Sequence, residues 1–101
     1  MNFGLSELEF KILDDILLKP LKNKGAKVWI FGSRARGTQK PFSDIDIMYA
    51  ISSNIVLPDG FLFEIKEKLD DSNLPFKVDL VDEKEIAQSY KPGALKDRIE
   101  I

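Results

Sequence analysis

The chain has 101 residues, 44% of them hydrophobic, which is enough apolar material for one modest core and leaves no room for a second independent domain. Its 15 basic and 17 acidic side chains give a net charge of −2, so the chain as a whole has no attraction for nucleic acid or an anionic membrane. Cysteine and histidine are both absent. Disulfides, zinc–thiolate sites and imidazole catalysis are therefore excluded within this chain, and carboxylates are left as its strong anionic ligands and bases.

The N-terminus lacks a basic region followed by an apolar run, which a secretory leader would have. No apolar stretch approaches the roughly 18 residues that a membrane-spanning helix needs. We therefore expect a cytoplasmic protein with no membrane partner, built as a single domain over residues 1–101.

The first predicted element is an amphipathic helix. Ser6 and Glu9 have the spacing of a capping box, and leucine and isoleucine then recur at helical spacing, which predicts a helix over roughly 6–23. Gly25 can adopt the left-handed conformation that commonly ends a helix. Pro20 is expected to shorten or kink the last turn of this helix.

A β-branched and aromatic run at 27–31, closed by Gly32, predicts a strand that leads into a tight turn. If residues 33–36 open a short helix, the N–H groups after Gly32 and the positive helix end point at any anion bound there. Residues 37–43 are rich in turn formers and polar side chains, which predicts a loop.

The next predicted strand, over residues 44–51, carries two aspartates. Because side chains alternate along a strand, Asp44 and Asp46 point to one side together with Met48, and the isoleucines between them point to the other. Both carboxylates therefore share one face of a strand whose opposite face is apolar.

An apolar stripe from Phe61 to Leu69 predicts a helix that begins near 57–59 and ends at the polar stretch 70–73. A third strand is predicted at 76–81. There Asp79 shares a face with Lys77, opposite the more apolar face.

The end of the chain is less regular. Asp82 is placed to cap a short helix at 83–88, a turn is predicted at 91–93, and residues 94–101 have some helical pattern. The whole chain thus predicts an α+β domain, in which a small mixed β-sheet of at least three strands carries helices packed on its apolar face.

Two aspartates at positions i and i+2 on one strand face repel each other unless a cation lies between them. A hard divalent cation such as Mg²⁺ solves that problem, because it prefers oxygen ligands and keeps positions for water and phosphates. Asp79 is the natural third carboxylate, and a third ligand permits a two-ion site. In such a site one metal lowers the pKa of the attacking hydroxyl, and the other holds the triphosphate and stabilises the leaving pyrophosphate.

The ordered set of Gly32-Ser33, then Asp44-x-Asp46, then Asp79 on a later strand resembles the three-part signature of the DNA polymerase beta-like nucleotidyltransferase superfamily. The longer segments 31–37 and 43–47 are similar to its minimal nucleotidyltransferase branch in particular. Members of that branch are stand-alone domains of about this length, commonly paired with a helical HEPN-domain protein as antitoxin and toxin.

The resemblance implies a nucleotidyltransferase fold and transfer of AMP from ATP to a hydroxyl, that of a tyrosine on a partner HEPN toxin, with release of pyrophosphate. It implies that Asp44 and Asp46 hold the metals. Asp79 would complete the first metal site and accept the proton of the acceptor.

The same resemblance assigns nucleotide binding to the segment before the aspartates. Ser33 would bind the terminal phosphates through its hydroxyl and the loop amides, with Gly32 allowing close backbone approach. Of Arg34 and Arg36, at least one would face the triphosphate, and the other would contact the partner or lie in solvent.

Other interpretations remain open. Taken singly, Ser33 is more often a helix cap than a ligand, and Asp79 is equally a carboxylate on an exposed strand face. A non-catalytic antitoxin that neutralises its toxin by binding alone is the main alternative function. An antibiotic or tRNA nucleotidyltransferase fits less well, because the chain has no room for an acceptor domain and lacks the basic face that nucleic acid requires.

Overall fold

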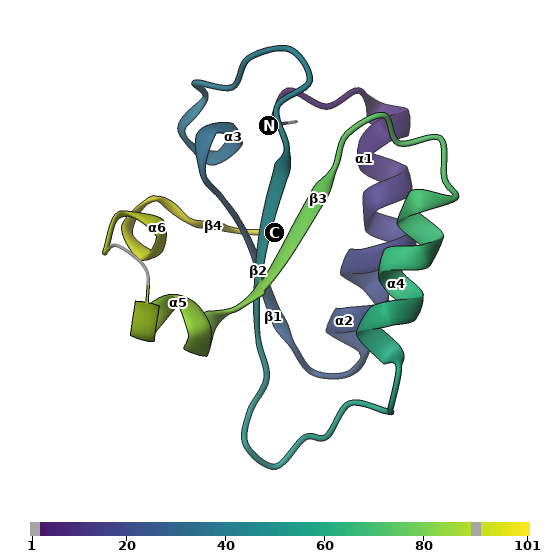
Figure 1. The fold of residues 1–101 in the computed structure, drawn as a ribbon, viewed down its shortest axis with the longest axis vertical. Coiled ribbons are helices and arrows are strands. Elements are labelled where there is room, and N and C mark those ends of the chain that lie inside the picture. The colour runs from purple at the N-terminus through teal and green to yellow at the C-terminus, as the bar shows by residue number, and fades with distance from the viewer. Residues whose placement is uncertain (1–2, 90–91) are drawn as a thin grey trace.

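The computed structural model describes residues 3–89 and 92–101, and its centre is a four-stranded mixed sheet. In chain order the strands are β1 (Lys27–Phe31), β2 (Ile45–Ala50), β3 (Val78–Asp82) and β4 (Ile99–Glu100). Their spatial order is β3-β2-β1-β4, as Figure 1 shows, with β1 antiparallel to β2 and β4, and β2 parallel to β3. The predicted fold class is confirmed, and the three predicted strands lie within two residues of their predicted bounds.

The predicted N-terminal helix is confirmed, with an interruption. It consists of α1 (Glu7–Leu13), a π-helical turn (Asp14–Leu18) and α2 (Lys19–Asn23). The capping box is present: the Ser6 hydroxyl accepts from the Glu9 N–H at 3.0 Å, and the Glu9 carboxylate accepts from the Ser6 N–H at 2.8 Å.

The π-helical turn ends at Leu18, two residues before Pro20. Proline has no N–H to donate to the fourth preceding carbonyl, and its ring crowds that carbonyl, so a widened turn relieves the clash without ending the helix. The expected distortion by Pro20 is therefore present, but it lies in the turn before the proline.

One face of the sheet is covered by the N-terminal helices and by α4 (Phe61–Asp70), as Figure 1 shows. Fully buried side chains such as Leu17 from the helices and Ile30 and Ile47 from the strands meet there. Helix α4 begins at Phe61, with Gly60 as its N-cap residue. This start is slightly later than the one expected near residues 57–59.

The opposite face carries the short helices α5 (Glu83–Ser89) and α6 (Pro92–Asp97), which correct the expectation that helices pack on one face alone. At one end of that face Trp29, Met48 and Ile86 form a second buried cluster. The predicted aspartates Asp46 and Asp79 lie towards the other end, where the Gly32 turn that follows β1 lies against Asp46.

The C-terminal predictions need two further corrections. Pro92 and Gly93 belong to α6 instead of a turn, while Lys91 lies outside the described residues. The helical pattern ends at Asp97, and Ile99–Glu100 instead pairs with the free edge of β1. The Ile101 N–H also bonds the Val28 carbonyl at 3.0 Å, so backbone pairing with an available edge overrides a weak helical pattern. Among the described residues, no helix has both the length and the apolar character needed to cross a bilayer.

Candidate active site

Two of the predicted carboxylates are neighbours across the sheet. In the parallel pairing of β2 with β3, Asp46 lies opposite Asp79, and on its other side Asp46 lies opposite Phe31 of β1. Both aspartates point away from the face that the N-terminal helices and α4 cover. Side chains alternate along a strand, and the neighbouring residues, such as Ile45 and Ile47, point into the core on that face. The sheet therefore brings together residues 33 positions apart in sequence (79 − 46).

The turn after β1 delivers the predicted phosphate-binding segment to the same place. Gly32 has φ 74°, and α3 (Ser33–Arg36) begins immediately after it, so the short predicted helix is confirmed. The N–H groups of Ala35 and Arg36 donate to the Gly32 carbonyl at 3.1 and 3.2 Å. Ser33 is half-buried at the start of this helix, and it directly follows Gly32, whose backbone lies against the carboxylate of Asp46.

The carboxylates interact electrostatically. The pKa of Asp46 is raised above its usual range, first by burial and then by the negative charges of Asp79 and Asp44. The positive charges of Arg36 and Arg34 oppose this rise. Asp44 is exposed just before β2, so the sheet face carries a half-buried carboxylate flanked by two others, an arrangement that a cation would stabilise.

The three carboxylates share a region but do not form a closed cage. Within residues 3–89 and 92–101, no three carboxylate, histidine or cysteine side chains converge closely enough to hold an ion by themselves. Magnesium commonly uses only one or two carboxylates and completes its shell with water and substrate phosphates. The donor set here, all oxygen, fits that mode of binding.

The prediction that Arg34 binds nucleotide does not fit its position. Its guanidinium is buried and donates to the carbonyls of Phe3 and Ser43, so it is committed to the protein backbone. Arg36 is half-exposed and lies 3.5 Å from a carboxylate oxygen of Asp97 on α6. Of the two arginines, Arg36 is the one that solvent and a ligand can reach.

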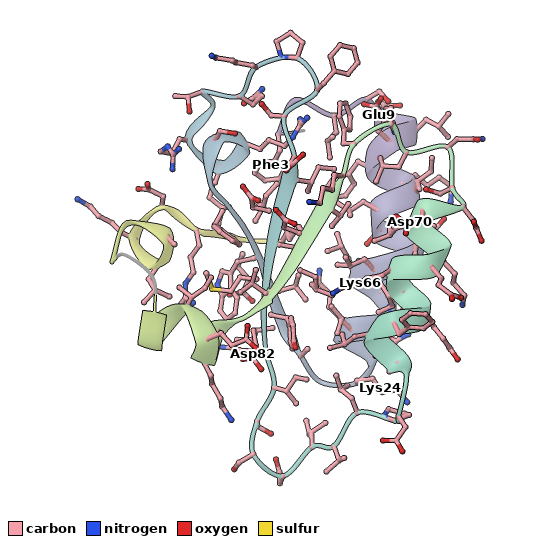
Figure 2. The ribbon with its side chains drawn as sticks, in the orientation of Figure 1. Phe3, Glu9, Lys24, Lys66, Asp70 and Asp82 are labelled. Atoms are coloured by element: carbon pink, nitrogen blue, oxygen red, sulfur yellow. The ribbon has the colours of Figure 1, made fainter. Side chains whose placement is uncertain are left out.

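A cavity of about 560 Å³ lies beside the aspartates, within the size range of small-molecule sites. The aspartates Asp46 and Asp79 line this cavity together with Phe31 and Ile86. It also includes residues of the edge strand β3, together with Lys66 of α4, which is labelled in Figure 2. The aspartates are thus accessible from the free edge of β3.

Lys77 was not predicted as a site residue. Its ammonium lies 3.9 Å from an Asp79 carboxylate oxygen and it lines the cavity. The alternation along the third strand had already placed Lys77 on the same face as Asp79, so the signal was present in the sequence. Lys66 had no such signal, because only the packing of α4 brings it near the site.

Residues 16–101 match the family described as Polymerase beta, Nucleotidyltransferase. The chain belongs to this family. The resemblance carried by the glycine-serine turn and the three aspartates is therefore confirmed at the level of the family, and the sheet that pairs Asp46 with Asp79 is the scaffold of a nucleotidyltransferase.

Relatives of this nucleotidyltransferase include a Haemophilus influenzae protein named "Probable protein adenylyltransferase MntA", which is 44% identical over 55 residues. That match covers 54% of this chain and 46% of the relative, so it spans about half the length of each.

Two solved structures are similar as a whole. A toxin-antitoxin crystallised with AMP-PNP has a TM-score of 0.57 and 26% identity, over 86% of this chain and 70% of that one. A mutant toxin-antitoxin MntA-HpeT has a TM-score of 0.54 and 27% identity, over 97% of this chain and 72% of that one.

Proposed function

We propose that this nucleotidyltransferase transfers AMP from ATP, with Mg²⁺, to a hydroxyl of a partner HEPN-domain toxin, and so acts as a cytoplasmic antitoxin. Its net charge of −2 argues against a nucleic acid as the acceptor. The observation that carries the proposal is the pairing of Asp46 with Asp79 across β2 and β3, beside the Gly32 turn. The MntA-like relative and the toxin-antitoxin neighbours, one of them holding AMP-PNP, support the same class of reaction.

Asp44, Asp46 and Asp79 would hold the Mg²⁺, in a two-ion site. The fit rests on their chemistry: the three are hard oxygen donors, and the charges of Asp44 and Asp79 already raise the pKa of Asp46. Bound Mg²⁺ would supply charge neutralisation on the triphosphate and lower the pKa of the acceptor hydroxyl.

The residues of the chain then have distinct tasks. The Ser33 hydroxyl and the amides after Gly32 would hold the terminal phosphates, and Arg36 would lie close enough to offset their charge. The acceptor oxygen attacks the α-phosphorus, the bond from that phosphorus to the bridging oxygen breaks, and pyrophosphate leaves. Asp79 would accept the proton that the acceptor hydroxyl loses.

The acceptor would reach the aspartates over the edge of the sheet formed by β3. The cavity extends along this strand, and Asp79 is half-exposed there. We propose a tyrosine of the partner as the acceptor, because a long side chain with a terminal hydroxyl can reach across an edge strand to a carboxylate on the face of the sheet.

The test is to incubate the chain with the partner toxin, Mg²⁺ and labelled ATP, and to locate any adduct by mass spectrometry. We expect the wild-type chain to add AMP to the partner, and Asp44→Asn with Asp46→Asn to abolish labelling while preserving the fold. The matched control is Glu64→Gln with Glu67→Gln, which removes the same charge from the exposed surface of α4 and should label normally. Full labelling by the aspartate double variant would refute the proposal.

Neutralisation by binding alone is the second candidate, favoured by the fact that the two structural neighbours described above are toxin-antitoxin assemblies. The same double variant separates the two functions. If it forms a stable complex with the toxin on gel filtration and still neutralises it in cells, neutralisation does not need transfer. If the complex forms but toxicity returns, the transfer of AMP is the neutralising step.

A further inference from the structure

Arg34 is the one charged side chain that is buried among the described residues, with 2% of its surface exposed. Burying a charge is costly unless hydrogen bonds or a counterion compensate it. No carboxylate of the described residues lies within ion-pair distance of Arg34, so backbone carbonyls provide the compensation. A buried cation of this kind indicates a specific task for the guanidinium.

The guanidinium joins two loops. Its Nη2 and Nε atoms donate to the Ser43 carbonyl at 2.8 and 3.2 Å, and its Nη1 donates to the Phe3 carbonyl at 2.9 Å. Figure 2 shows Phe3 near α3, the helix that carries Arg34. The N-terminal segment is packed tightly here, since a Cβ added to Gly4 would lie 2.9 Å from Arg34 Nη1.

The flat face of the guanidinium meets a third segment. The Arg34 carbon Cζ lies 4.4 Å from the centre of the Phe76 ring, a cation–π contact just before β3 begins at Val78. Only arginine has the planar fork that donates in two directions while stacking on a ring; a lysine ammonium is a point donor.

We propose that Arg34 is a positioning residue for the carboxylate site. By holding the carbonyl of Ser43, it fixes the peptide unit from which Asp44 extends, and through Phe76 it fixes the approach to β3 and Asp79. The role of Asp44 as a metal ligand rests on the proposed function, whereas the fixing of the Ser43–Asp44 peptide does not.

The experiment compares Arg34→Lys with wild type and with Leu17→Ala, a destabilised control whose change lies in the helix-covered core. The first readout is the Mg²⁺ concentration at the midpoint of the metal-dependent rise in melting temperature, measured without nucleotide. The second is hydrogen exchange at the Ile45 amide, which donates to the Lys77 carbonyl at 2.8 Å, with Tyr49 at the other end of β2 as the internal reference.

For Arg34→Lys we expect the Mg²⁺ midpoint to rise about tenfold, the usual scale for losing a group that orients a ligand. Hydrogen exchange at the Ile45 amide should become faster than the change in global stability explains. Exchange at the Tyr49 amide should change only as much as global stability does. Leu17→Ala should lower the melting temperature, leave the Mg²⁺ midpoint unchanged and accelerate both amides alike. An Arg34→Lys chain that keeps the wild-type midpoint, or keeps the wild-type ratio of exchange at the two amides, overturns the proposal.

If Arg34→Lys does not fold, Phe76→Leu replaces it, because it removes the stacked ring and keeps the guanidinium. The proposal then requires Phe76→Leu to raise the Mg²⁺ midpoint and to speed exchange at Ile45 relative to Tyr49. If the wild-type chain itself has no Mg²⁺-dependent rise, the proposed function fails at the metal site, and the exchange at Ile45 alone decides whether Arg34 fixes the peptide before Asp44.

Discussion

The backbone of Gly32 lies directly against the carboxylate of Asp46: a Cβ built on Gly32 would stand 2.3 Å from Asp46 Oδ2. No heavy atom fits at that distance, so the turn after β1 and the aspartate of β2 are held in contact only because residue 32 has no side chain. The same glycine has φ 74°, where other residues are strained.

Gly32→Ala should therefore damage both the fold and the site. The added methyl must displace the Asp46 carboxylate, and alanine is strained at this φ, so we expect a loss of about 1–3 kcal/mol in the free energy of unfolding. The proposed transfer of AMP should fall to about a tenth of the wild-type rate or less, because a displaced reacting group slows catalysis by this scale or more. Gly37→Ala is the matched control, since Gly37 also has φ 74° but has open space around its Cβ position. Urea denaturation and labelling assays should show that Gly37→Ala loses about 1 kcal/mol and retains transfer.

Asp46→Asn should stabilise the metal-free protein at neutral pH while removing its activity. The pKa of Asp46 is raised in the folded protein, so its ionisation opposes folding: the penalty is absent below the ordinary aspartate pKa and is complete above the raised value. At pH 7.5 in a chelating buffer we expect the variant to be more stable by about 1 kcal/mol. This difference should shrink as the pH falls towards 4, where the wild-type carboxyl becomes protonated.

Chemical denaturation at both pH values measures this effect. Glu67→Gln, which removes a carboxylate from the exposed surface of α4, serves as the control and should show no comparable gain. Added Mg²⁺ should stabilise the wild-type chain more than Asp46→Asn. A variant that is less stable than wild type at pH 7.5 without metal would contradict the electrostatic account of the site.

Phe42→Gly should stabilise the loop that leads to Asp44. Phe42 has φ 67° and is 79% exposed, in a turn closed by a 3.1 Å bond from the Ser43 N–H to the Lys40 carbonyl. The left-handed conformation costs an L-residue about 1–2 kcal/mol, which glycine avoids, and the exposed ring contributes little to the core. We expect a gain of about 1 kcal/mol, measured by thermal or urea denaturation. Phe42→Ala keeps the strained conformation and should bring no gain; equal gains from both variants would show that the ring, and not the backbone, sets the cost.

Ser6→Ala should lower stability without changing the chemistry. It removes the hydroxyl that accepts from the Glu9 N–H at the start of α1, and losing such a cap costs about 1 kcal/mol. The rate of the proposed AMP transfer, measured at a temperature where the variant is folded, should equal that of wild type. Ser53→Ala, in the exposed loop after β2, should leave both quantities unchanged. A large fall in transfer by Ser6→Ala would show that the helix start is coupled to the site.

The local elements were largely predictable from the sequence. The β-branched run of β1 and the alternation around Asp46 identified strands and the face on which each side chain lies, because a period of two residues fixes the face. The capping box at Ser6 likewise identified where α1 begins, since its two hydrogen bonds depend on residues three apart. β4 was missed, because two residues are too few to show a period and their partner strand lies some 70 positions earlier by simple count (99 − 30 = 69).

The sequence by itself determined which side chains could form the site: the glycine-serine turn, the two aspartates on one strand face and Asp79 on another. Only the tertiary structure decided that Asp46 lies opposite Asp79, because alternation fixes a face but not the neighbouring strand or its register. It also decided that Arg34 is buried while Arg36 is half-exposed. Two arginines two positions apart point in different directions on a helix. Which of these directions faces the interior depends on the N-terminal segment and the Ser43 loop, which close over Arg34.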